Sequence, residues 1–261
     1  MNQYLSSASL KSLAKGQLLG KYGTVIGAFM LHGLCIMPIS MILSLTIGTG
    51  TAIQTILYCL ATFLVNLFAG FFVAGEAYIY LKVACNQKPQ VMDLFYCFRG
   101  DTMKVLKLQA VFAAVSLVCS LPAQIVSGFV NDSISAAAYS SKIVPGTLPV
   151  SGSLFLTYVI LFLAGTVIEI FVRLLFSQVF YLMLDFPQYT AKELFQMSLR
   201  LMKGNIGRLF YLQISFLPLI LLSFLSCGIA LLWISPYMDA TLANFYLDLI
   251  KKKTMQEPSV F

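Results

Sequence analysis

Two groups of polar residues lie inside apolar stretches of the sequence and are the candidates for a functional site. The first is the pair Glu169 and Arg173, which lie four positions apart and therefore share one face of a helix. A charge near the centre of a bilayer costs about 2.5–3.5 kcal/mol, so such a pair is expected to form an ion pair and face a protein interior. Two roles fit it: an ion relay, proton relay or substrate contact, or a neutralised pair that fixes helix packing.

The second group is a polar stripe near the C-terminal end. Its members follow one another at spacings of four, three and four, which places them on one helix face: Tyr237, Thr241, Asn244 and Asp248. Pro236 is expected to bend this helix near its start. Bent helices with polar faces line sites in transporters, and the same pattern is typical of a helix that lies in the interface with its polar side in water.

Motifs for catalysis and metal binding are missing from the sequence. It has no phosphate-binding loop, no HExxH and no GxSxG. Its six cysteines form no CxxC pair, and its single histidine, His32, lies in the first apolar run. Glu76, near the end of another run, could complete a polar cluster or lie among lipid headgroups, and we favour the headgroups. We therefore expect no enzyme activity, no metal and no cofactor.

The composition requires lipid as the main solvent of the chain. Hydrophobic residues make up 59% of the 261 positions and charged residues 10%, with a mean hydropathy of +0.87. A soluble domain carries roughly 25% charged residues. The net charge of +7 comes from basic residues beside apolar runs, which indicates anionic headgroups rather than nucleic acid as the partner.

Apolar runs long enough to cross a bilayer predict the helices on which these residues lie. A spanning helix needs roughly 20 apolar residues, and we expect one all-α membrane domain over 1–261 with about six spans. At 31 residues the fourth run exceeds the bilayer, so it must tilt, kink or protrude. Residues 209–250 could instead form one span and an interfacial helix. The spans expected are 22–47, 53–79, 105–129, 154–184, 209–225 and 228–250.

The lysine and arginine distribution predicts the orientation. Residues 82–107 carry five of these residues and 185–208 carry four, whereas 130–152 carries only Lys142. By the positive-inside rule, the N-terminus and the two basic connections are cytoplasmic. A basic tail at 251–261 stays on the cytoplasmic side if the fourth span is followed either by two more spans or by a re-entrant hairpin. We favour six spans in a plasma membrane, with both termini inside. Headgroup contacts are expected from Lys11, Lys15, Lys203, Lys251, Lys252 and Lys253.

A weak internal echo accompanies this pattern. The segments 18–29, 97–108 and 201–212 each place a glycine and a polar turn between an amphipathic stretch and an apolar run. The amphipathic stretches, at 7–20, 88–100 and 189–203, are expected to be helices in the membrane interface. The echo suggests three units, each an interfacial helix followed by two spans, although any cytoplasmic segment that enters a membrane has similar features.

The sequence resembles a family of bacterial membrane proteins, the domain-of-unknown-function family numbered 975. Its N-terminal string LKSLAKGQLLGKYGTVIGA is similar to the opening motif of that family, and residues 195–250 are similar to its C-terminal signature. The resemblance covers essentially the whole chain. It implies a plasma-membrane protein with about six spans and implies no activity. The matching elements are Lys203-Gly204-Asn205, Phe210, Gly228-Ile229, Pro236-Tyr237 and Phe245-Tyr246.

Three functions fit these features. The first is a non-catalytic scaffold or accessory component that docks a membrane protein partner or lipid through its basic cytoplasmic surface. The second is a transport or permeation component, in which Glu169, Arg173 and the face of Thr241, Asn244 and Asp248 form one intramembrane site. The third is a membrane-embedded protein that handles lipids. Of the three, we expect the scaffold function.

Overall fold

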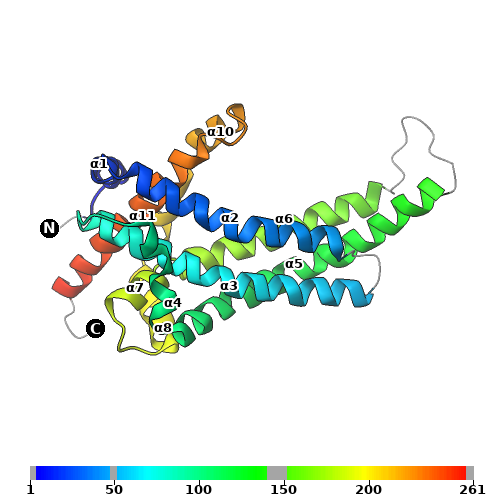
Figure 1. Cartoon of the computed structure of the whole chain (residues 1–261), viewed down its shortest axis with the longest axis horizontal. Helices are drawn as coiled ribbons and strands as arrows, with labels where there is room; N and C mark the ends of the chain where they lie inside the picture. Colours follow the sequence, from blue (N-terminus) through cyan, green and yellow to red (C-terminus); the bar gives the residue numbers. More distant parts are fainter. Residues whose placement is uncertain (1–3, 48–51, 140–151, 257–261) are drawn as a thin grey trace. The chain divides into compact units, whose positions relative to one another are not determined.

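The computed structural model describes residues 4–47, 52–139 and 152–256, and within these ranges it contains helices and no strand (Figure 1). This confirms the predicted all-α fold class. The helices are α1 (Ser7–Leu18), α2 (Tyr22–Thr46), α3 (Ala52–Ala84), the 3-10 helix η1 (Val91–Phe95), α4 (Tyr96–Arg99), α5 (Thr102–Tyr139), α6 (Gly152–Leu175), α7 (Val179–Asp185), α8 (Ala191–Met202), α9 (Ile206–Ile214), α10 (Leu217–Leu225) and α11 (Leu231–Gln256).

Five helical stretches of the described chain are long and apolar enough to cross a membrane: Tyr22–Thr46, Ile53–Ala84, Thr102–Phe129, Gly152–Asp185 and Ile206–Leu225. The chain is therefore a membrane-embedded helical protein. The fourth stretch breaks between α6 and α7, as its excessive length suggested. The fifth divides into α9 and α10. The helix α11 covers the sixth expected span, 228–250, but it is not among the candidates because its second half is polar.

Two expected boundaries differ from the structure. Helix α5 continues through Pro122 to Tyr139, ten residues beyond the expected end at 129. The remainder of the 130–152 loop, Lys142 included, lies outside the described residues. Helix α11 extends to Gln256, and the rest of the 251–261 tail also lies outside them.

The chain forms two compact units. Unit 1 comprises Met1–Cys35, Ala69–Leu108 and Leu174–Phe261, and unit 2 comprises Ile36–Phe68 and Gln109–Arg173. Helices α2, α3 and α5 each contribute residues to both units. The two units are a finer division than the single membrane domain that we expected.

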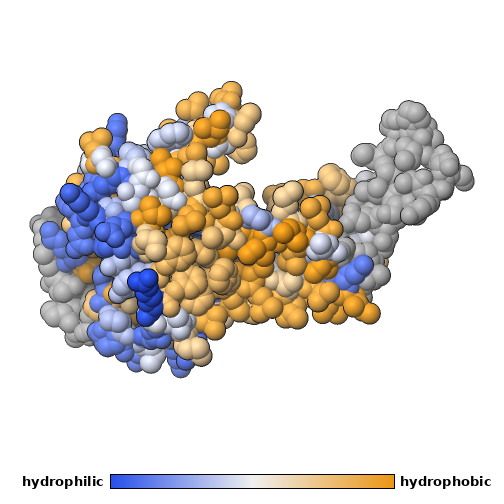
Figure 2. All heavy atoms as spheres, in the orientation of Figure 1, coloured by the Kyte–Doolittle hydropathy of each residue, from blue (hydrophilic) through white to orange (hydrophobic). Residues whose placement is uncertain are grey.

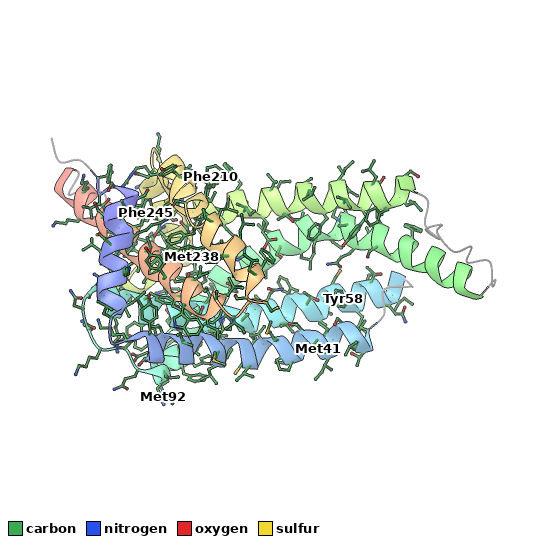
Figure 3. The ribbon with its side chains drawn as sticks, turned by 90° about the horizontal axis from the view of Figure 1, so that it is seen from above. Met41, Tyr58, Met92, Phe210, Met238 and Phe245 are labelled. Atoms are coloured by element: carbon green, nitrogen blue, oxygen red, sulfur yellow. The ribbon has the colours of Figure 1, made fainter. Side chains whose placement is uncertain are left out.

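Unit 1 has α11 in its core. Both faces of this helix are buried, including Ala240, Ala243, Phe245 and Tyr246, each no more than 1% exposed. Helix α1 packs against it, and Phe245 lies beside α1 in Figure 3. From α7, the ring of Tyr181 stacks on that of Tyr246 at 5.2 Å. This burial explains why a helix with several polar residues is stable here: its neighbours are protein side chains.

Two turns of unit 1 share one geometry and explain two of the three echo segments. Between α1 and α2, Leu19 has φ −57° and ψ 127° and Gly20 has φ +74°. Between α8 and α9, Lys203 has φ −57° and ψ 118° and Gly204 has φ +81°. These are type II turns, which require a positive φ at the third residue and therefore favour glycine there. The third segment differs, because Gly100 has φ −97°.

Unit 2 presents apolar side chains on the outside of its helices. Met41 of α2 is 64% exposed, and Ile53 of α3 and Val167 of α6 are 79% and 65% exposed. In contrast, polar residues gather over the part of the molecule that carries α1, α7 and α8, all in unit 1 (Figure 2). The outer surface of unit 2 is the kind that acyl chains cover.

Candidate functional site

Glu169 and Arg173 form the ion pair that their spacing suggests. Arg173 donates to the Glu169 carboxylate from Nε at 3.1 Å and from Nη2 at 2.8 Å, within one turn of α6. The Arg173 side chain is 62% exposed and that of Glu169 is 27% exposed. The guanidinium therefore lies on the outside of unit 2, while the carboxylate is partly covered.

A groove of about 190 Å³ with both polar and apolar walls runs along α5 and α6 in unit 2, and Glu169, Tyr158 and Phe162 are among its lining residues. From α5 it is lined by a stripe of Ser120, Gln124 and Ser127, and from α6 by Thr166. We missed this stripe in the sequence, although its spacings of four and three are the same signal that revealed the stripe on α11. The groove offers hydroxyls, one amide and one carboxylate that is already ion-paired, so it suits a small neutral polar solute.

A close approach of two helices fixes this groove. A Cβ atom built on Gly165 of α6 would lie 2.4 Å from the carbonyl oxygen of Cys119 on α5. Only glycine therefore permits this distance between the helix backbones. On α5, the Gln124 amide donates to Ser120 at 3.0 Å and accepts from the Cys59 thiol of α3 at 2.9 Å. The amide is thereby held between two helices.

A second, smaller cavity of about 20 Å³ lies between α3 and α5 in unit 2. The Thr62 hydroxyl lines it and is buried without a hydrogen-bond partner among the described residues. Nearby, the Gln109 amide donates to the carbonyl oxygen of Asn66 at 3.0 Å. Polar side chains therefore follow α5 along much of its length in unit 2.

The stripe on α11 lies in unit 1, and its polar groups are bound by other parts of that unit. Thr241 donates to the Tyr237 carbonyl of its own helix at 2.7 Å. Asn244 donates to the Gln17 side chain of α1 at 2.6 Å, and Gln17 donates to the Ala84 carbonyl at the end of α3. These contacts show that Thr241 and Asn244 bind protein groups of unit 1, and Asn244 binds α1 through Gln17.

Asp248 connects the N-terminal segment with α9 and α11. Its side chain is 5% exposed and accepts from Arg208 of α9 at 3.1 Å and from the backbone N–H of Leu5 at 3.2 Å. Arg208 also donates to the Leu5 carbonyl at 3.0 Å, and its guanidinium lies 4.1 Å from the centre of the Tyr4 ring. This buried pair therefore fixes the N-terminal segment against α9 and α11.

The five residues of the expected intramembrane site thus belong to two units. Glu169 and Arg173 lie in unit 2, while Thr241, Asn244 and Asp248 lie in unit 1. The polar groups of each set bind partners within their own unit. Their convergence on one site stays a prediction.

Glu76 forms a polar contact with the single histidine of the chain. Its carboxylate lies 2.9 Å from Nδ1 of His32, and the two side chains are 17% and 20% exposed. The His32 ring also stacks on Phe72 at 5.3 Å. The sequence separation of 44 residues hid this pairing of the single histidine with an acid on the next helix.

The lysines expected at headgroups divide into two classes. Lys11 donates to the Ser215 carbonyl at 2.9 Å and lies 4.0 Å from the Phe216 ring centre; burial lowers the pKa of its ammonium group. Lys252 is buried over the Tyr4 ring at 4.3 Å. The side chain of Lys253 lies outside those described. The exposed members are Lys15, Lys203 and Lys251.

The family model described as "Protein of unknown function (DUF975)" matches residues 1–253. The chain belongs to this family. A search of curated proteins and a search of solved structures each found no match. The match confirms the resemblance seen in the N-terminal and C-terminal motifs. It covers residues of both units of this DUF975 protein.

Structure explains several of the DUF975 motif residues in this chain. Gly204 forms the type II turn before α9, and Asn205 accepts from Arg208 at 3.1 Å. Gly228, at φ +85°, forms the turn before α11. Phe245 and Tyr246 lie in the core of unit 1. The residues that carry the resemblance therefore shape the turns and core of unit 1.

Proposed function

We propose that this DUF975 protein is a non-catalytic scaffold or accessory component of a plasma membrane, with unit 1 and both termini in or facing the cytoplasm. The observation that carries the proposal is the charge distribution. Of the 17 Lys and Arg residues, only Lys142 and Arg173 fall in unit 2. Unit 1 carries all the others, and the positive-inside rule therefore assigns unit 1 to the cytoplasmic face.

The exposed basic residues of unit 1 supply a docking surface. They come from α1, the connection before η1, α4, the start of α5, α8 with the turn after it, and α11. Asp101, Asp185 and Glu193 are the exposed acidic residues among the described residues of this unit. We expect this surface to bind anionic headgroups and an acidic face of a membrane protein partner. Its members are Lys15, Lys88, Arg99, Lys107, Lys192, Arg200, Lys203 and Lys251.

Site-specific crosslinking in cells tests the scaffold function. A photo-crosslinking residue at Lys15, Lys192 or Lys203 is expected to capture the same partner reproducibly. The same residue at Val118, which is 65% exposed on the apolar surface of unit 2, is the control and is expected to capture lipid. If the three basic positions yield the same products as Val118, the scaffold proposal is wrong.

The groove of unit 2 favours permeation of a small neutral solute as the second candidate. Gln124 and Ser127 line it, and nothing charged faces it except a carboxylate that Arg173 neutralises. Glycerol uptake into proteoliposomes, followed by light scattering, tests this function. Gln124→Leu is expected to abolish uptake, whereas Val118→Leu on the outer surface of α5 is expected to leave it unchanged. Uptake no faster than in protein-free liposomes would exclude glycerol permeation.

A further inference from the structure

The hairpin at the end of unit 1 is apolar at its tip and has no charged residue between Arg208 and Asp239. Large side chains of α10, of the turn and of the start of α11 point away from the unit, and α10 is apolar in Figure 2. Water is a poor solvent for such a surface. The exposed side chains include Leu221 at 58%, Phe224 at 75%, Leu225 at 83%, Ile229 at 62% and Trp233 at 51%.

The turn between α10 and α11 satisfies its own polar groups, as a segment in hydrocarbon must. The N–H of Gly228 donates to the Ser223 carbonyl at 2.8 Å, and that of Cys227 donates to the Phe224 carbonyl at 3.2 Å. The Ser226 hydroxyl donates to the Ser223 carbonyl at 2.9 Å and accepts from the Ala230 N–H at 3.0 Å. Two positive φ angles, at Cys227 and Gly228, close the turn within few residues.

The α9–α10 arm of the hairpin, Ile206–Leu225, is long enough to cross a bilayer, but the α11 arm is too short in its apolar part to return across it. Asp239 of α11 interacts with the Tyr80 hydroxyl, and Tyr80 is four residues from the end of α3 at Ala84. From that level the apolar part of α11, Leu231 to Met238, extends only about 12 Å at 1.5 Å per residue. Added to about 6 Å of α3, this reaches the middle of a hydrocarbon core about 30 Å thick.

Both ends of the hairpin contact the N-terminal segment of the chain. Arg208, at the start of α9, and Asp248, near the end of α11, bind each other and the backbone of Leu5. Lys11 of α1 binds the α9–α10 junction through Ser215. The segment that leaves this side at α9 therefore returns to it at α11.

We infer that α9, α10 and the first half of α11 form a re-entrant hairpin whose tip inserts among the acyl chains of the leaflet next to unit 1. Four helices then cross the membrane, α2, α3, α5 and α6 with its extension α7, and the hairpin acts as a wedge in one leaflet. The inference concerns lipid contact and stands apart from the identity of any scaffold partner.

Trp233 is the single tryptophan of the chain, so its fluorescence reports the depth of the hairpin in the unmodified protein. The full chain is reconstituted in phosphatidylcholine–phosphatidylglycerol liposomes that contain lipids brominated at shallow, middle or deep acyl positions. Bromines nearest the bilayer centre are expected to quench Trp233 most. Strongest quenching by shallow bromines would overturn the inference, because a hairpin that crosses the bilayer, or one that lies flat in the interface, places Trp233 near headgroups.

Cys227 at the tip and Cys85 after α3 are both exposed and serve as a matched pair of native probes. Burial raises the pKa of the Cys85 thiol, with Asp185 adding to the shift, so labelling is done at mildly alkaline pH. An impermeant maleimide is expected to label Cys85 in vesicles that expose unit 1 and to label Cys227 from neither face until detergent is added. Labelling of Cys227 from the face opposite to Cys85 would show a hairpin that crosses the membrane, and labelling from the same face would show a tip in water; either result overturns the inference.

Discussion

Units 1 and 2 neutralise their charged side chains in different ways. In unit 1, two acidic side chains find partners far away in the sequence: Asp248 binds Arg208 and the backbone of Leu5, and Glu76 binds His32, whereas Asp101 binds the nearby Lys104. In unit 2, the charged pair among the described side chains lies within one turn of α6. The long-range pairs of unit 1 therefore join distant segments, whereas the pair of unit 2 leaves helix arrangement to glycine and neutral polar residues.

The largest expected effect comes from breaking one ion pair in each unit. Arg208→Gln leaves the carboxylate of Asp248, 5% exposed, without its cation. Removing one partner of a buried pair costs about 3 kcal/mol. Arg173→Gln removes an exposed i,i+4 partner, which costs about 0.5 kcal/mol. Unfolding of the purified protein in detergent, followed by circular dichroism, measures both losses, and equal losses would contradict the difference between the units.

The second test compares the two closest helix approaches. A Cβ at Gly75 of unit 1 would lie 1.9 Å from the Leu94 carbonyl oxygen, and one at Gly165 of unit 2 would lie 2.4 Å from that of Cys119. Overpacking costs about 1–3 kcal/mol, so Gly75→Ala and Gly165→Ala are both expected to destabilise the protein, the former more. Gly33→Ala is the control, because nothing lies within 4 Å of its added methyl group. A loss at Gly33 equal to that at Gly75 would show that the clash is not the cause.

Local signals in the sequence predicted local features of both units. The spacing of Glu169 and Arg173 predicted their pairing, and the glycines at 20 and 204 marked turns between helices. The stripe on α11 was visible as a stripe. Its partners were not, because Gln17 lies 227 residues away from Asn244, and periodicity carries no information about such contacts.

Tertiary contacts supplied the partners that the sequence could not. A polar stripe on an apolar helix does not reveal which protein groups bind it, and the stripe of Thr241, Asn244 and Asp248 includes one residue, Asn244, that binds Gln17 of α1. For Glu76, the sequence left a polar cluster and the headgroups both open, and its contact with His32 comes from another helix. A polar residue in a membrane protein therefore needs its partner before it can be assigned a role.

A smaller effect, of opposite sign, is expected at the unpaired hydroxyl of unit 2. The Thr62 hydroxyl is buried without a partner in the described structure, so Thr62→Val removes a desolvated polar group while keeping the shape of the side chain. A gain of about 1 kcal/mol is expected. Thr241→Val in unit 1 is the matched change, and it loses a hydroxyl that donates to Tyr237 at 2.7 Å. Unfolding in detergent compares the two, and a loss of stability with Thr62→Val would show that this hydroxyl is paired in solution.

The smallest expected effect concerns a local charge in unit 1, at the start of α8. The Thr190 N–H at 2.8 Å and the Thr190 hydroxyl at 2.9 Å donate to the Glu193 carboxylate, and these hydrogen bonds hold its pKa below the ordinary value. The folded state therefore gains stability from this group above the ordinary pKa of a glutamate, and loses it as the pH falls through the lowered pKa. Hydrogen exchange of the α8 amides is expected to speed up at acid pH in the parent protein, relative to the intrinsic rate. In Glu193→Gln this acid-dependent change should be absent, because the amide cannot titrate. An identical acid response in both proteins would mean that the Glu193 cap does not stabilise α8.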